Sequence, residues 1–212
     1  MREDAEGCST GVALLQHVKV REYDLIADWY AAERVDHTGV PEALALARLL
    51  PAGARVLDIG CGNGKPITEA LLTADVRVVG MDSATTMLAR FRLNVPAAPA
   101  VRAVAQTLPF VDERFEGAIA WGVMFHLPQA EEVKVIASVA RVLRPGGSFL
   151  FTAGDVADDS GDHVGIMNGV SFRYYSFTMD SYRRLLADHG FHVVGFHKDA
   201  GNNGHYLAAK RL

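Results

Sequence analysis

One segment constrains the fold of this chain more than any other: VLDIGCGNG, at residues 56–64. It begins as a short apolar run, which is typical of a buried strand in a parallel sheet. Three glycines follow, and glycines let a backbone turn tightly and approach a ligand without side chains in the way. A helical pattern begins near Pro66. The segment therefore predicts a strand, a ligand-binding turn and a helix in succession.

The same alternation of strands and helices continues along the chain. The predicted strands are 55–59, 76–81, 101–104, 116–121, 148–152, 191–196 and 204–210. The predicted helices are about 23–34, 42–50, 66–74, 83–93, 129–143 and 178–190, with Ser83 and Thr178 expected to cap the helices that follow them. Alternation predicts a parallel sheet with helices on both faces. The last two strands, joined by a short turn at 200–203, add one antiparallel strand. We therefore expect an α/β, doubly wound sheet of seven strands, six parallel and one antiparallel.

Length and composition limit the class of protein. The chain has 212 residues, half of them apolar, which is enough for one core. We expect residues 1–40 to form a leader and a lid helix packed on the domain that residues 41–212 form. The net charge of -4 argues against nucleic acid as the main partner, and two cysteines are too few for a disulfide framework. The polar N-terminus and the lack of a long apolar run predict a cytoplasmic protein without a membrane span, and leave the oligomeric state open.

The spacing of the glycines and the two aspartates near them indicate which ligand the turn binds. Dinucleotide sites use G-x-G-x-x-G with a helix N-terminus aimed at pyrophosphate, whereas this turn is G-x-G-x-G. Asp58, two residues before the turn, is poorly suited to a pyrophosphate. It suits a ligand with an ammonium group, such as the methionine part of S-adenosylmethionine. Asp82 ends the second strand, where it can accept hydrogen bonds from ribose hydroxyls, but both kinds of cofactor use such an acid.

The motifs, taken in order, resemble those of the class I (Rossmann-like) S-adenosylmethionine-dependent methyltransferases. They are VLDIGCGNG, VVGMDSATTML, AQTLPF, FEGAIAWGVMFHL, RVLRPGGSFLFT and HYLAAKR. The resemblance extends from about Tyr23 to the C-terminus. It implies S-adenosylmethionine as cofactor, S-adenosylhomocysteine as product, and transfer of a methyl group to an oxygen, nitrogen or sulfur atom of a small molecule.

The resemblance also implies binding roles for matching residues. Around the methionine end these are Asp58, Gly60, Cys61, Gly62 and Gly64. Asp82 would bind the ribose, Ser83 and Met87 would flank the adenosine, Ala105 and Gln106 would lie beside the adenine, and Trp121 and Gly122 would line the cleft near the sulfonium. The family often has an acidic residue two positions before Gln106, to contact the adenine amino group. Here Val104 occupies that position, so the adenine would be contacted by backbone atoms or by Gln106.

Residues outside these motifs are candidates for catalysis and closure. His126 follows the fourth strand and is the candidate catalytic base, although a histidine at this position could instead cap the next helix or pack under the sheet. Tyr23, Tyr30 and Arg34 lie on the predicted lid helix, where they could bind the methionine carboxylate or simply pack and be solvated. His163 and His205 are weaker candidates.

We expect residues 153–177 to form a long surface loop, with at most a short strand near 172–175, that encloses the substrate side. Its aromatic residues, Phe172, Tyr174, Tyr175 and Phe177, could line an acceptor pocket or anchor the loop. The same segment holds Asp155, Asp158, Asp159, Asp162 and His163. Metal-dependent methyltransferases place their ligands after the fourth strand, so we expect a solvated acidic loop and no metal.

Two other functions remain open from the residues alone. One is a non-catalytic module that binds S-adenosylmethionine. The other is a nicotinamide-dependent oxidoreductase, which the turn spacing and the lack of a Tyr-x-x-x-Lys pair disfavour.

Overall fold

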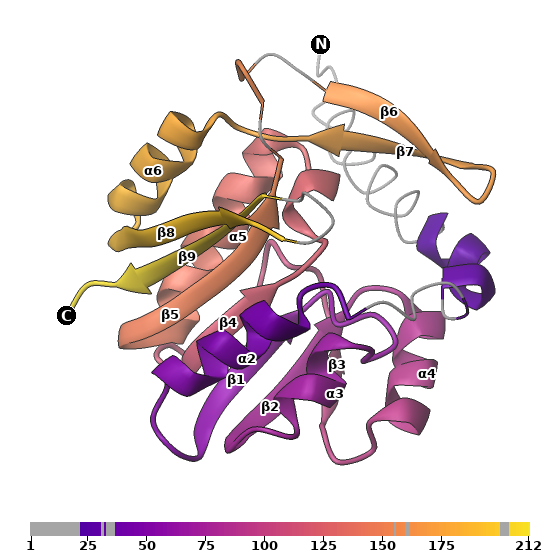
Figure 1. Cartoon of the computed structure of the whole chain (residues 1–212), viewed down its shortest axis with the longest axis horizontal. Coiled ribbons are helices and arrows are strands. Elements are labelled where there is room, and N and C mark those ends of the chain that lie inside the picture. Colours follow the sequence, from indigo (N-terminus) through magenta and orange to yellow (C-terminus); the bar gives the residue numbers. More distant parts are fainter. Residues whose placement is uncertain (1–21, 31, 33–36, 155, 160–161, 200–203) are drawn as a thin grey trace, which may run out of the picture.

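The central element of the computed structural model is a twisted sheet (Figure 1). The structure describes residues 22–30, 32, 37–154, 156–159, 162–199 and 204–212, and within them this sheet has seven strands in the order β3-β2-β1-β4-β5-β9-β8. The strands are β1 (Ala54–Ile59), β2 (Val76–Asp82), β3 (Ala100–Arg102), β4 (Phe115–Ala120), β5 (Leu143–Ala153), β8 (Phe191–Lys198) and β9 (Gly204–Lys210). The order reverses beside β1, which is the point where such sheets bind ligands.

The strand directions confirm the predicted topology. The pairs β1–β2, β2–β3, β1–β4 and β4–β5 are parallel. β9 pairs antiparallel with both β5 and β8, so it alone in this sheet runs against the other six. The turn predicted at 200–203 lies outside the described residues. The fold is therefore the Rossmann-like α/β sheet that the alternation predicts.

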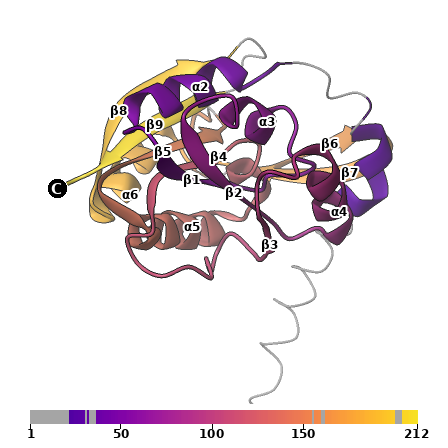
Figure 2. The same ribbon diagram turned by 90° about the horizontal axis from the view of Figure 1, so that it is seen from below.

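Helices cover both faces of the sheet (Figure 2). They are α2 (Val40–Leu49), α3 (Ile67–Leu71), α4 (Thr85–Asn94), α5 (Gln129–Val142) and α6 (Met179–Asp188), together with a helical stretch at 22–30. Figure 2 shows α2 and α3 on one side and α5 and α6 on the other. Consecutive residues of β1 serve the two faces, because Val56 belongs to the apolar cluster of α2 and α3, and Leu57 to that of α5 and α6. This alternation explains why β1 is apolar on both sides.

Of the two helix caps predicted from the sequence, the structure shows one and not the other. Thr178 caps α6, since its hydroxyl accepts a hydrogen bond from the Ser181 amide at 3.2 Å. The prediction that Ser83 caps α4 is wrong. The N-cap is Ala84, and its amide donates to Oδ1 of Asp82 at 2.8 Å instead. α4 therefore begins without a side-chain cap, and Asp82 instead holds the amide of its N-cap residue.

The prediction of a long loop at 153–177 is also wrong, because most of the segment forms a hairpin. β6 (Asp162–Met167) pairs antiparallel with β7 (Val170–Tyr175), which contains the short strand predicted near 172–175. Asn168 and Gly169 form the turn with φ of 47° and 75°. An Asn-Gly pair between alternating apolar residues favours such a hairpin turn, and this is the signal that the prediction missed.

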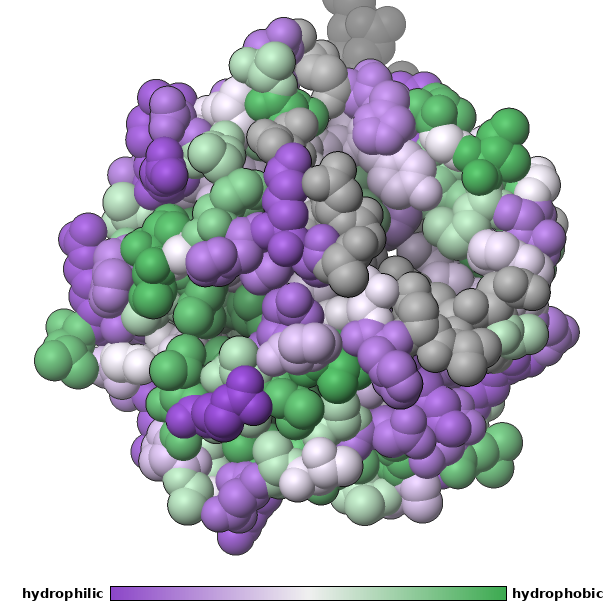
Figure 3. All heavy atoms as spheres, in the orientation of Figure 1, coloured by the Kyte–Doolittle hydropathy of each residue, from purple (hydrophilic) through white to green (hydrophobic). Residues whose placement is uncertain are grey.

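The surface mixes polar and apolar side chains. Figure 3 shows hydrophilic and hydrophobic residues interspersed over the face drawn in Figure 1. Large exposed apolar side chains include Leu25, Leu93 and Ile166, which lie on three different elements. Among the described helices, none combines the length and the apolar character needed to cross a bilayer.

Candidate functional site

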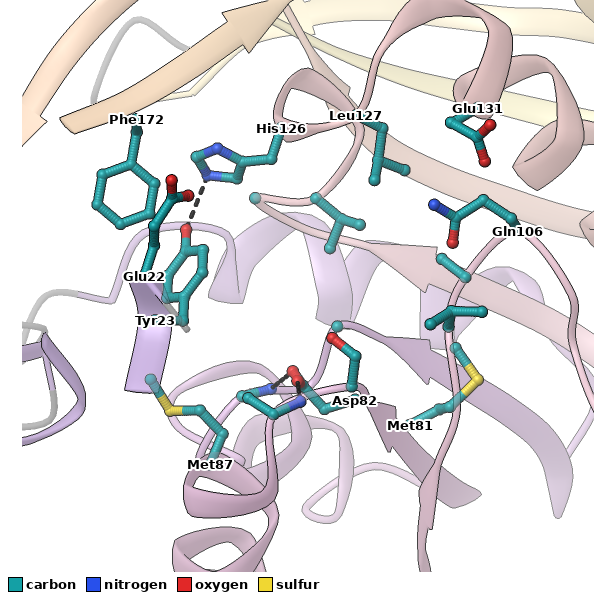
Figure 4. A pocket seen from close by; sticks show the side chains of 18 of the residues that line it. Glu22, Tyr23, Met81, Asp82, Met87, Gln106, His126, Leu127, Glu131 and Phe172 are labelled. Carbon is teal, nitrogen blue, oxygen red and sulfur yellow. Dashed lines mark hydrogen bonds between the residues drawn. The ribbon is translucent and has the colours of Figure 1, made fainter. Parts of the chain in front are cut away.

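A cavity of about 320 Å³ opens at the carboxyl ends of β1, β2 and β4 (Figure 4). Its walls are the glycine turn, the end of β2, the segment after β3, the turn after β4, the start of α5, the stretch 22–30 and β7. The lining residues include Glu22, Tyr23, Tyr30, Gly60, Gly62, Asp82, Ser83, Met87, Val104, Ala105, Gln106, Trp121, Gly122, His126, Glu131 and Phe172. Most residues predicted to bind the cofactor are therefore brought together.

The glycine turn presents bare backbone to this cavity. Gly60 and Gly62 have φ of 69° and 54°, which side chains rarely adopt. A Cβ on Gly60 would lie 2.3 Å from a methyl carbon of Val123, so the two turns touch. A Cβ on Gly62 would meet nothing within 4 Å and would occupy the cavity. The turn thus requires glycine for close packing at one position and leaves room for a ligand at the other.

Asp82 connects the glycine turn to α4. Its Oδ2 accepts a hydrogen bond from the Gly62 amide at 2.9 Å, and its Oδ1 accepts from the Ala84 amide. Burial raises the pKa of Asp82, the backbone hydrogen bonds oppose this shift, and Asp24 nearby adds to it. A carboxylate has about four acceptor positions, so Asp82 can still accept hydrogen bonds from a ligand.

Three predicted residues of the first motif do not line the cavity. Asp58 is 2% exposed, and its Oδ2 accepts a hydrogen bond from the Thr68 hydroxyl at 2.5 Å. Burial raises the pKa of Asp58 to about 7, although the Thr68 hydrogen bond opposes the shift. Cys61 is buried in the apolar cluster of α2 and α3, and Gly64 packs against Phe91. Ligand contact by these three residues stays a prediction.

The stretch 22–30 is fastened to the cavity by a hydrogen bond. The Tyr23 hydroxyl lies 2.7 Å from Nε2 of His126, as the dashed line in Figure 4 marks. The Tyr23 ring also makes edge contacts with Tyr30 and Phe172, at centroid distances of 5.7 and 5.2 Å. One tyrosine therefore joins the N-terminal helical stretch, the turn after β4 and the hairpin. Arg34, predicted on the same helix, lies outside the described residues.

Apart from His126 and Phe172, the histidine candidates and the aromatic candidates of the hairpin region lie outside the lining. His163 stacks on Tyr174 at 5.0 Å, and Tyr174 in turn contacts His126. Phe177 packs on Tyr182 in the core, and His205 lies against Trp121 at 5.5 Å. Of the hairpin aromatics proposed for an acceptor pocket, Phe172 lines the cavity.

The acidic residues between β5 and α6 have structural partners. Asp159 accepts hydrogen bonds from the Thr178 amide and the Ser181 hydroxyl, both at 2.5 Å, at the start of α6. Asp162 forms an ion pair with Arg173. Asp155 lies outside the described residues, and in the ranges that the structure does describe no three His, Cys, Asp or Glu side chains group as metal ligands.

Two acidic residues of the lining, Glu22 and Glu131, were not predicted from the sequence. Glu131 lies in the first turn of α5, and Glu22 begins the helical stretch 22–30. Neither belongs to a motif, and which side of a helix faces the cavity depends on packing between segments. Periodicity alone therefore could not identify them.

Comparisons with known proteins point to one family. Residues 56–147 match the model of a family described as Methyltransferase domain. An uncharacterized methyltransferase of Synechocystis sp. is 36% identical over 97 residues, or 46% of this chain and 45% of that protein. The 27-O-demethylrifamycin SV methyltransferase of Amycolatopsis mediterranei is 37% identical over 110 residues, or 48% of this chain and 40% of that protein. The chain thus spans less than half the length of these curated relatives.

A solved structure shows the same fold over nearly the whole chain. It is the 1,6-didemethyltoxoflavin-N1-methyltransferase of Burkholderia thailandensis, with 1,6-didemethyltoxoflavin and S-adenosylhomocysteine bound. The TM-score is 0.69 at 21% identity, over 93% of this chain and 90% of that chain. The matched model over residues 56–147, the relatives and the fold agree with the series of motifs, and in each comparison the chain is similar to methyltransferases.

Proposed function

We propose that this protein binds S-adenosylmethionine in the cavity and transfers its methyl group to an oxygen, nitrogen or sulfur atom of a small molecule. One observation carries the proposal: the bare backbone of Gly62 and the Asp82 carboxylate face one cavity at the carboxyl ends of the strands. The names of the relatives support it, because a rifamycin and a toxoflavin precursor are small molecules. We expect the acceptor to be a small molecule of the cytoplasm.

The lining fits the parts of this cofactor. The glycine turn gives the methionine end open space beside Gly62, because a Cβ there would meet nothing within 4 Å. Asp82 keeps acceptor positions for the ribose hydroxyls. Ser83 and Met87 on one side, and Ala105 and Gln106 on the other, provide walls for the adenine. This arrangement leaves His126, Tyr23 and Phe172 for the acceptor side.

S-adenosylmethionine, when bound, supplies a methyl group already activated by the positive sulfonium, so the protein chiefly aligns the reactants and excludes water. Tyr23 and Phe172 serve the second purpose, because they cover one end of the cavity. We propose that His126 takes the proton from a hydroxyl or ammonium acceptor. Tyr23 would act as a positioning residue, since its hydroxyl is held at Nε2 of that imidazole.

The direct test is a transfer assay with labelled methyl groups. Purified protein and S-adenosylmethionine carrying a labelled methyl group are incubated with fractionated small-molecule extracts, and the label is followed by mass spectrometry. The proposal predicts a labelled product of low molecular mass. Cofactor binding without any labelled product, across extracts of varied polarity, would contradict the enzymatic part.

The same assay examines the role of His126. For a hydroxyl or ammonium acceptor we expect His126→Asn to lower kcat by roughly 10²–10⁴-fold, the usual contribution of general base catalysis. Cofactor affinity should change little, because the imidazole faces the acceptor side. His163→Asn is the matched control, since His163 stacks on Tyr174 and does not line the cavity. Equal turnover by His126→Asn and wild type would remove the base from the proposal.

A further inference from the structure

Glu131 is a carboxylate of the cavity that has no role in the motifs. Glu131, in the first turn of α5, lines the cavity beside the segment after β3. Its Oε1 forms an ion pair with the Lys134 ammonium at 2.8 Å. Its Oε2 is buried and has no hydrogen-bond partner among the residues that the structure describes. The side chain is therefore anchored through one oxygen while the other is withdrawn from water.

A buried carboxylate oxygen without a donor is unfavourable for the ligand-free protein. Burial removes the water that would otherwise hydrogen-bond the oxygen, and no protein donor replaces it. A ligand that supplies an N–H or O–H at this position would restore the lost bond. Since Glu131 lines the cavity, the ligand of the cavity is the natural source of that donor.

The position of Glu131 in the cavity indicates which hydrogen-bond donor of the ligand it can contact. Figure 4 shows Glu131 beside Gln106, with Asp82 on the opposite side of the cavity. If the proposed function holds, the ribose hydroxyls face Asp82 and the ammonium faces the glycine turn. The remaining donor of S-adenosylmethionine is the amino group on carbon 6 of the adenine, which would lie on the side of Ala105 and Gln106.

We propose that Oε2 of Glu131 accepts a hydrogen bond from the 6-amino group of the adenine. The inference rests on the proposed function and goes beyond it, because it assigns a specificity-determining residue that no motif contains. It also explains why this chain can have Val104 at the position where the family often has an acidic residue that contacts the adenine amino group. The carboxylate that the segment after β3 lacks is supplied instead from the start of α5.

The assignment predicts selectivity for a 6-amino purine. A carboxylate can only accept hydrogen bonds, so it pairs with an amino group and repels a 6-oxo group. A charge-assisted bond of this kind changes affinity by roughly 10- to 100-fold when one partner is removed. Lys134 assists by holding the other oxygen, which fixes the direction of Oε2.

The test compares two ligands on wild-type protein and on variants by titration calorimetry. The ligands are S-adenosylhomocysteine and its analogue in which hydrogen replaces the 6-amino group. We expect wild type to bind the analogue roughly 10-fold more weakly. Glu131→Met should bind S-adenosylhomocysteine roughly 10-fold more weakly than wild type and should no longer distinguish the two ligands. Glu69→Met is the matched control, because Glu69 is half exposed on α3 and does not line the cavity.

The outcomes separate this inference from the proposed function. Failure of wild type to bind S-adenosylhomocysteine would overturn both. Binding by wild type with the same ratio of affinities in Glu131→Met would overturn the role of Glu131 alone. Glu131→Gln keeps an acceptor without the charge, so its ratio should lie between those of wild type and Glu131→Met. If Glu131→Met does not fold, Glu131→Gln decides alone. The same ratio of affinities for the two ligands in Glu131→Gln and wild type would then overturn the role of Glu131.

Discussion

Asp82 is the residue on which the cavity depends most directly. Its carboxylate holds the glycine turn through the Gly62 amide and keeps further acceptor positions on the ligand side. We predict that Asp82→Ala weakens the binding of S-adenosylhomocysteine by about 1–3 kcal/mol, the usual effect of losing charge-assisted hydrogen bonds. Titration calorimetry measures the change. Asp112→Ala is the control, because Asp112 is an exposed partner of Arg141, and wild-type affinity in Asp82→Ala would contradict the assignment.

Asp58 makes a prediction about pH. Its folded pKa is about 7, raised by burial from the ordinary 3.8, so between these two values the folded protein keeps a proton that the unfolded chain has lost. Stability is therefore greatest below about pH 4 as far as this group is concerned, and it falls as the pH rises to 7. We expect the melting temperature of the ligand-free protein to fall less steeply over this range in Asp58→Asn. An identical slope in both proteins would show that Asp58 does not titrate as its burial requires.

Residues of the site differ in how far the sequence identifies them. Gly60, Gly62 and Asp82 could be predicted, because a strand, a tight turn and a helix fix them locally. Glu131 could not, since its position relative to the cavity depends on how α5 packs on the sheet. Asp58 is an intermediate case. The sequence predicts its position near the end of the first strand, whereas its hydrogen bond with Thr68 could be found only in the three-dimensional structure.

At the scale of elements, the helical stretch 22–30 is joined to α4 and to the turn after β4. On the α4 side, Arg90 donates a hydrogen bond to the Ala27 carbonyl and pairs with Asp28. The Tyr23 hydroxyl and its hydrogen bond with His126 join it to the turn after β4. We predict that Tyr23→Phe increases amide hydrogen exchange in residues 22–30 while exchange in β1 and β4 stays unchanged, because one of the contacts that oppose local opening of the stretch is then lost.

The control for this prediction is Tyr175→Phe, because Tyr175 lies on β7 but does not line the cavity. Added S-adenosylhomocysteine should slow the exchange again if the stretch closes over the ligand. Exchange in residues 22–30 that is the same in Tyr23→Phe and wild type would show that the hydrogen bond does not hold this stretch.

Helices and strands marked by a capping residue or a clear apolar pattern were predicted well. Segments in which polar residues and glycines obscure such a pattern were not. β9 was predicted with its observed bounds, and α6 with its Thr178 cap. α3 is shorter than predicted, at Ile67–Leu71, because the segment after the glycine turn is partly irregular. The hairpin of β6 and β7 was missed because its polar and glycine-rich composition obscured the Asn168-Gly169 turn.

At the scale of the whole molecule, the sheet separates two apolar clusters, and the cavity lies where neither cluster fills the space at the strand ends. The stretch 22–30 and the hairpin of β6 and β7 cover that space from outside the core fold. The fold could be predicted from alternation and motif order, because both follow from local patterns. The covering of the cavity could not, since it depends on contacts between segments far apart in the chain.

The central claim is that this cavity takes a sulfonium nucleoside and not a dinucleotide. The most direct measurement follows the melting temperature of the protein with S-adenosylhomocysteine and, separately, with NAD. A ligand at 100 times its Kd stabilises the folded state by about 2.7 kcal/mol. We expect a saturable rise in melting temperature with S-adenosylhomocysteine and no rise with NAD. A rise with NAD alone would contradict it.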